Sequence, residues 1–137
     1  MRRISAFVPA VLSIFVLACS SAPDTDSTPT PTTVASAALD PSGMYDFVAT
    51  MGGESRTGTL EIERSAANGF TGEAWLEGEG DPAQIVSGSI VGNHVLLNAL
   101  VGMNDITFEL DFTGAAFAGT ITAGDQVIDV TGTKRAN

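Results

Sequence analysis

The sequence predicts an all-β domain, and we expect it to be an eight-stranded antiparallel up-and-down β-barrel. All fifteen glycines fall between Gly43 and Gly132, where they separate short runs of residues. Those runs alternate apolar and polar residues, which is typical of strands with one face in a core. No stretch after residue 40 shows the period of a useful amphipathic helix. A two-sheet β-sandwich is the alternative architecture.

Eight runs along the chain qualify as strands. The clearest is Thr59–Glu63, where Leu60 and Ile62 share one face, and Ile106–Phe112 alternates over a longer distance. In order, the predicted strands cover residues 44–50, 56–64, 70–77, 84–91, 94–101, 105–113, 116–122 and 126–133.

The connections between these runs are short. Asn68-Gly69 predicts a two-residue type I′ hairpin, and Gly92-Asn93 predicts the same kind of turn. The longest connection is Gly78–Ala83. Because no connection has room for a crossover helix, successive strands should pair antiparallel. A flat sheet would leave two exposed edges, and closure into a barrel removes them.

The N-terminus has the form of a secretory signal peptide, which we place at residues 1–18. Arg2 and Arg3 form a basic start, and the mostly apolar run Ile4–Leu17 follows. That run is shorter than the roughly 20 apolar residues that a membrane-spanning helix needs.

The end of the leader, Val16-Leu17-Ala18-Cys19, resembles the lipobox of bacterial lipoproteins. The resemblance implies cleavage between Ala18 and Cys19 and attachment of a diacylglyceryl group to the Cys19 thiol. The new amine would usually be acylated too, with a chain such as palmitate. Several acyl chains anchor a protein stably, whereas one is marginal. By the same resemblance Ser20, rather than Asp, favours the outer membrane over the inner membrane, with the domain in the periplasm or outside the cell.

Residues 19–39 are interpreted as the lipidated cysteine and a flexible tether, and residues 40–137 as the folded domain. The tether is rich in Ser, Thr, Pro and Ala and has no aromatic residue. Such a segment cannot bury enough apolar surface to offset the entropy of ordering it.

The charge balance limits the class of partner. The chain has six Lys and Arg against sixteen Asp and Glu, and two of the six basic residues lie in the leader. A mature chain beginning at Cys19 would therefore have a formal charge of −12. This excess of acidic groups argues against nucleic acid as a partner, since binding to phosphates needs Lys and Arg. Cys19 is the sole cysteine, so no disulfide can form within the chain.

The domain is also similar to a small all-β module of exported bacterial proteins, and the similarity implies a lipocalin-like barrel without a settled activity. The matching pieces are turn glycines and core aromatics, which indicate fold more than function. They are Gly43-x-Tyr45-x-Phe47, Gly58-x-Leu60-x-Ile62, Asn68-Gly69-Phe70-Thr71-Gly72, Val91-Gly92-Asn93, Phe108-x-Leu110-x-Phe112-x-Gly114, Phe117-x-Gly119-Thr120 and Gly132-Thr133-Lys134-Arg135.

No catalytic constellation is visible, and we expect a protein without enzymatic activity. His94 is the sole histidine and follows a turn, with no motif that supplies a nucleophile. No cofactor and no ordinary zinc set is predicted. Glu77, Glu79 and Asp81 alternate in a glycine-rich turn and are candidates for weak calcium binding. The other acids, such as Glu61, lie on the polar phase of strands rather than converging as a glycosidase pair.

Trp75 is the candidate contact residue. It shares its phase with Glu73 and Glu77, so it should project outward, unless a bulge near Gly72 returns it to the core. An exposed Trp is a plausible anchor for a partner. The fifth predicted strand, Val95–Val101, is apolar on both faces except for Asn98, which is typical of a strand that is covered on both sides or faces lipid, a ligand or a partner.

These features favour a lipid-anchored, non-enzymatic binding or interaction module of the cell envelope, and no more specific molecular function is indicated. We expect large side chains to fill much of the barrel and an envelope protein to bind outside it. A carrier of a small apolar ligand, of the lipocalin type, is the first alternative, because an eight-stranded barrel can hold one small ligand. An inhibitor of a hydrolase, acting through the Gly78–Ala83 loop, is the second.

Overall fold

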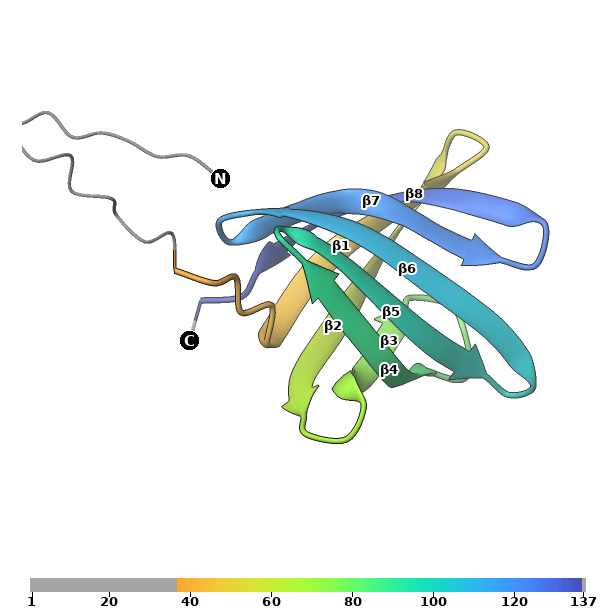
Figure 1. Cartoon of the computed structure of the whole chain (residues 1–137). Helices are drawn as coiled ribbons and strands as arrows, with labels where there is room; N and C mark the ends of the chain where they lie inside the picture. The colour runs from red at the N-terminus through yellow and green to blue at the C-terminus, as the bar shows by residue number, and fades with distance from the viewer. Residues whose placement is uncertain (1–36, 137) are drawn as a thin grey trace, which may run out of the picture. The chain divides into compact units, whose positions relative to one another are not determined.

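The computed structural model describes residues 37–136, and these form eight β-strands (Figure 1). Each strand lies within two residues of its predicted bounds. The strands are β1 (Gly43–Met51), β2 (Glu54–Ser65), β3 (Gly69–Leu76), β4 (Ala83–Val91), β5 (His94–Val101), β6 (Asn104–Thr113), β7 (Ala116–Ala123) and β8 (Gln126–Lys134).

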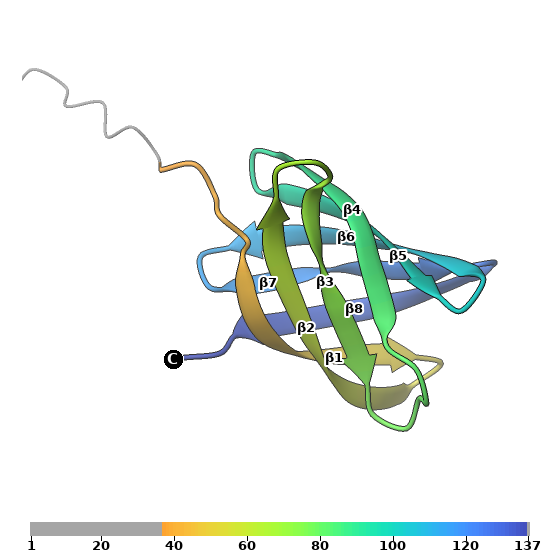
Figure 2. The same cartoon turned by 90° about the horizontal axis from the view of Figure 1, so that it is seen from below.

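The strands close into one barrel. Each strand pairs antiparallel with the next, and β8 pairs antiparallel with β1, so that no edge is left open (Figure 2). The register of closure sets Phe47 opposite Gly132 and Ala49 opposite Val130. The up-and-down barrel is therefore confirmed, and the sandwich alternative is wrong.

The turns explain why the glycines are spaced as they are. The four connections after β4, β5, β6 and β7 contain two residues each, and the first of the two is always a glycine with φ between 60° and 64°. Such primed turns match the twist of the strands that they join. Gly92-Asn93 is one of them. The expectation for Asn68-Gly69 needs a correction, because the β2–β3 connection contains three residues and Gly69 already pairs with Ser65.

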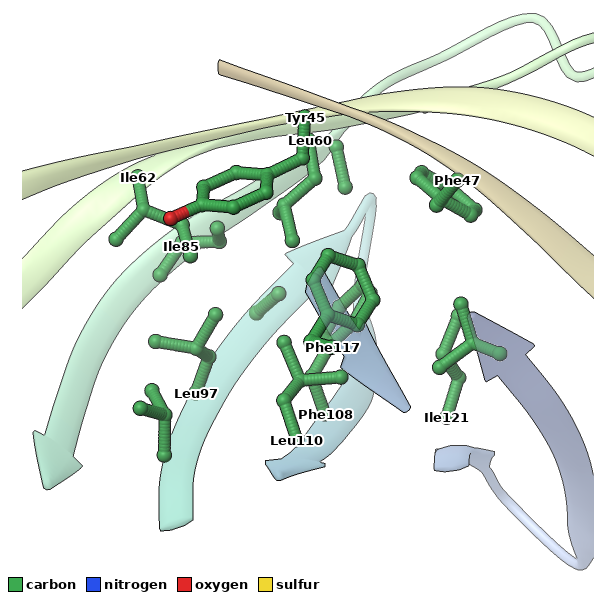
Figure 3. Close-up of a cluster of buried hydrophobic side chains, with 14 of the residues drawn as sticks. Tyr45, Phe47, Leu60, Ile62, Ile85, Leu97, Phe108, Leu110, Phe117 and Ile121 are labelled. Atoms are coloured by element: carbon green, nitrogen blue, oxygen red, sulfur yellow. The ribbon is translucent and has the colours of Figure 1, made fainter. Parts of the chain in front are cut away.

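The inner face of the barrel is apolar. Alternate residues on every strand point inward, and Figure 3 shows several of them converging from different strands. No polar or charged residue of the described chain is buried in this core. The buried hydrophobic residues are Tyr45, Phe47, Ala49, Leu60, Ile62, Phe70, Ala74, Ala83, Ile85, Val95, Leu97, Ala99, Phe108, Leu110, Phe112, Phe117, Ile121 and Val130.

One end of the barrel is closed, and we call it the closed end. Tyr45, Phe112 and Phe117 meet there with ring centroids 5.5–5.6 Å apart. The chain enters at this end, where Pro41 is fully buried and Leu39 packs against the core. Aromatic rings in tilted and edge-to-face contact pack densely, so the three rings fill the interior between them.

The opposite end, which we call the open end, carries the β1–β2, β3–β4, β5–β6 and β7–β8 connections. No element of the described chain packs across it in the way that residues 37–42 pack across the closed end. Within residues 37–136 there is no helix long and apolar enough to cross a membrane.

Candidate functional site

A cavity of about 440 Å³ occupies the open end of the barrel, and we call it the open-end cavity. Its inner wall is mostly apolar. The apolar lining residues are Phe47, Ala49, Ala74, Leu76, Ala83, Val101, Ile106, Phe108, Ile121, Ala123 and Ile128. A volume of this size falls within the roughly 300–1,000 Å³ of small-molecule pockets.

The sequence explains why this end is hollow. Four of the residues that line the cavity are alanines, namely Ala49, Ala74, Ala83 and Ala123, and they come from four different strands. Ala74 and Ala83 lie directly opposite each other on β3 and β4. A methyl group fills far less of the interior than the rings at the closed end. The expectation that large residues fill the barrel therefore holds at the closed end and is wrong at the open end.

The rim of the open-end cavity is polar. Glu79 and Asp81 come from the β3–β4 connection, and Asn104 and Asp105 come from the start of β6. Gln126, at the start of β8, completes the rim. All five side chains are exposed to solvent. An apolar wall below a polar rim is the usual arrangement of a site for a molecule with an apolar body.

The three carboxylates proposed for calcium do not point to one place. Glu79 forms a 2.9 Å ion pair with Arg56, and the Glu77 carboxylate accepts a hydrogen bond from the Thr57 hydroxyl. Asp81 forms no ion pair with any described residue. Within residues 37–136, no three His, Cys, Asp or Glu side chains are arranged to hold a metal ion.

Trp75 lies on the outer face of the barrel, as the phase of its strand predicts, and is 49% exposed. The β2–β3 register runs regularly through Gly72, so no bulge turns the indole inward. Trp75 lines a surface groove, which we call the Trp75 groove. Val48 on β1 and Thr59 on β2 also line it. The structure thus places the predicted contact residue at the surface of the barrel.

Arg135 and Asp46 line the Trp75 groove, as do Glu77 and Glu79. Their side chains form an ion pair in which the guanidinium donates to both carboxylate oxygens. The hydrogen bond from Arg135, followed by its charge, lowers the pKa of the Asp46 carboxyl below its usual value of 3.8. The pair therefore stays ionised at neutral pH.

His94 has a partner that sequence reasoning missed. Its Nδ1 atom lies 2.9 Å from Asp111 Oδ1, because the two residues face each other across β5 and β6. Both side chains are about half exposed or more, on the outer face near the closed end. The side chains of Glu61, Glu63 and Glu109 also lie on the outer face of their strands, as the sequence predicts for residues exposed to solvent.

The fifth strand is less enclosed than its composition suggests. Val95, Leu97 and Ala99 face the core, and Leu96 and Leu100 on the other phase are partly exposed. The lipidation and cleavage predictions, at Ala18 and Cys19, lie outside the described residues.

The comparisons with known proteins concern the barrel alone. No known protein family and no curated protein sequence matches this chain. Among solved structures, fatty-acid-binding protein 1 of Echinococcus granulosus is 10% identical with a TM-score of 0.44, and the match covers 70% of this chain and 98% of that one. The wild-type fluorescent protein UnaG is 13% identical with a TM-score of 0.39, covering 69% and 96% of the two chains. With identities and TM-scores this low, nothing about a ligand follows from either.

Proposed function

We propose that this protein is a membrane-anchored, non-enzymatic carrier that holds one small apolar molecule in the open-end cavity. The observation that carries the proposal is the contrast between the two ends of the barrel. Three aromatic rings pack against one another at the closed end, whereas alanines on four strands line about 440 Å³ of mostly apolar space at the open end. A barrel that needed only stability would gain from filling that space, since voids forfeit packing contacts.

The anchor in this proposal is the lipid on Cys19. Support comes from the Val16-Leu17-Ala18-Cys19 motif and from the signal-peptide pattern before it. The described chain enters the barrel at the closed end, through residues 37–42. A tether would therefore join the domain at the end opposite the cavity.

Ligand binding is tested with a neutral apolar fluorophore, N-phenyl-1-naphthylamine, whose emission rises in an apolar site. We expect saturable binding to the wild-type domain. Ala83→Leu extends a side chain into the cavity and should remove most of the fluorescence increase. The matched control is Ala118→Leu, because Ala118 is an exposed alanine on the outer face of β7. Equal binding by the Ala83→Leu and wild-type proteins would contradict the proposed site.

Native mass spectrometry addresses the natural ligand. The protein is purified from its own membrane in a mild detergent and released into the gas phase. We expect an additional mass of several hundred daltons that is absent from the Ala83→Leu variant. Failure of the wild-type protein to carry any such mass, together with no fluorophore binding, would rule the carrier function out.

The anchor needs its own experiment. A Cys19→Ser variant should lose incorporation of an alkyne-tagged palmitate analogue. The wild-type protein serves as the reference. Retention of the label in the variant would contradict lipidation at Cys19.

A second candidate function is binding of an envelope protein at the Trp75 groove. The half-exposed indole favours it, since such residues are common anchors of interfaces. Trp75→Ala should abolish capture of a partner that the wild-type protein retains from solubilised envelopes. Val127→Ala, which truncates another exposed apolar side chain, is the control. Unchanged capture by Trp75→Ala would contradict this role.

A further inference from the structure

The ionisable groups that line the open-end cavity are all of one sign. They are the carboxylates of Glu79, Asp81 and Asp105, and the remaining polar side chains of the lining are the amides of Asn104 and Gln126. No Lys, Arg or His lines the cavity. A ligand whose apolar part occupies the cavity would therefore hold its polar head among carboxylates.

Two of these three carboxylates have no basic partner in the barrel. Glu79 is paired with Arg56 at 2.9 Å. The four ion pairs formed within residues 37–136 include neither Asp81 nor Asp105. Two uncompensated negative charges thus remain at the rim, one on the β3–β4 connection and one at the start of β6.

Other charged residues of the barrel add to the negative charge at the open end. The other connections at the open end add Glu54, beside the β1–β2 turn, and Asp125, in the β7–β8 turn. Three of the four basic residues between positions 37 and 136 lie toward the closed end. They are Arg64 on β2, next to the β2–β3 turn, Lys134 at the end of β8, and Arg135. Charges gathered around one opening give it a potential of one sign, which attracts ligands of the opposite sign.

We propose that the open-end cavity selects amphiphiles with a cationic head, such as alkylammonium compounds, and discriminates against amphiphiles with a carboxylate head. This inference rests on the proposed carrier function, because the apolar cavity provides the site and the rim decides only which head group it accepts. An ammonium head at the rim would be near the carboxylates of Asp81, Asp105 and Glu79. A carboxylate head at the same place would meet charges of its own sign, and no Lys, Arg or His lines the cavity.

The experiment compares three probes with one alkyl chain: dodecylammonium, dodecanol and dodecanoate. Each is titrated below its critical micelle concentration at neutral pH and low salt, and its affinity is measured by displacement of N-phenyl-1-naphthylamine. We expect dodecylammonium to bind roughly tenfold more tightly than dodecanoate, with dodecanol between them. The preference should shrink at 0.5 M salt, where the Debye length falls to about 4 Å.

Two double variants identify the rim as the cause. Asp81→Asn with Asp105→Asn should reduce the preference for dodecylammonium over dodecanoate to less than about threefold, without loss of dodecanol binding. The control, Glu63→Gln with Glu109→Gln, removes the same number of charges from exposed positions on the outer face. It should leave the preference close to its wild-type value.

The outcomes separate the two proposals. If dodecanoate binds as tightly as dodecylammonium, the head-group inference is overturned and the carrier function stands. If calorimetric titration, which needs no fluorophore, shows that dodecylammonium binds the Ala83→Leu variant as tightly as the wild type, it binds the acidic surface instead of the cavity, and the inference fails. If none of the three probes nor the fluorophore binds, the carrier function itself is wrong.

Discussion

The hydroxyl of Tyr45 donates a 2.8 Å hydrogen bond to the carbonyl oxygen of Pro41 and so ties the segment before β1 to the closed end of the barrel. Pro41 is fully buried and Tyr45 is 2% exposed. The Tyr45 ring also meets Phe112 and Phe117 in edge-to-face contact. This side chain therefore both fills the closed end and holds the entering chain across it.

Loss of that hydroxyl should destabilise the barrel. Tyr45→Phe keeps the ring but leaves the buried Pro41 carbonyl without its partner, and we expect a loss of about 1 kcal/mol in the free energy of unfolding. Urea denaturation measures it. Ser55→Ala is the control, because its hydroxyl pairs with Thr50 on an exposed surface, and it should change stability by less than about 0.5 kcal/mol. Equal stability of Tyr45→Phe and the wild type would show that the bond contributes nothing.

The same tyrosine should make the barrel sensitive to alkali. Burial, followed by the charge of Asp40, raises the pKa of Tyr45 above its usual value of 10.0. The unfolded chain therefore loses the proton first, so this contribution to stability is complete below about pH 10 and is lost as the pH rises through the folded-state pKa.

Tyr45 is the sole tyrosine, so absorbance at 295 nm reports its ionisation without interference from other tyrosines. We expect the midpoint to lie above 10.0 in the folded protein and near that value in urea. Lys134, whose Nζ lies 5.7 Å from the ring centroid, is retained in the Tyr45→Phe variant. The difference in alkaline stability between the two proteins therefore isolates Tyr45, and a folded midpoint at or below 10 would contradict the prediction.

The sequence predicts the barrel better than the site, for a physical reason. The alternation of apolar and polar residues, as around Leu60, can be recognised within a short stretch of sequence, and so can the glycines at the turns. Together they predict where each strand lies and that consecutive strands pair. The cavity depends on Ala49, Ala74 and Ala83, from three different strands, lining one space, and on which side chains of each strand point inward. A count of small residues on the inward phase toward one end would have indicated it. The pairing of Asp111 with His94 likewise needed the cross-strand register.

Gly58 has no room for a side chain. A Cβ atom there would lie 2.4 Å from Phe47 Cζ and 2.4 Å from the Trp75 carbonyl oxygen. We expect Gly58→Ala to cost about 1–3 kcal/mol, since either the ring or the β3 backbone must move. The control is Gly80→Ala in the β3–β4 connection, where a Cβ would meet nothing within 4 Å. Thermal denaturation should separate the two variants clearly, and similar melting temperatures would contradict the close packing at Gly58.

The Asp46–Arg135 pair predicts a change at acidic pH. The pKa of Asp46 is lower in the folded protein than in the unfolded chain. The pair therefore stabilises the fold at pH values above the unfolded-state pKa, and this contribution is lost as the pH falls through the folded-state pKa. A carbon-detected NMR titration should find the Asp46 carboxyl midpoint below 3.8. Arg135→Gln should return it toward the ordinary value, whereas Arg64→Gln, which alters a different ion pair, should not. A midpoint unaffected by Arg135→Gln would exclude the guanidinium as the cause.

Phe112 and Phe108 test whether the two ends of the barrel differ in packing. They are almost equally buried, at 2% and 3% exposure, but Phe112 touches two aromatic rings and Phe108 lines the open-end cavity. A ring beside empty space has fewer contacts to lose. We therefore expect Phe112→Leu to destabilise the domain by about 1 kcal/mol more than Phe108→Leu, because it also removes aromatic pairs. Urea denaturation of both variants without ligand measures the difference. Equal losses would mean that the open end is packed as tightly as the closed end, and the cavity on which the proposed function depends would then not exist in solution.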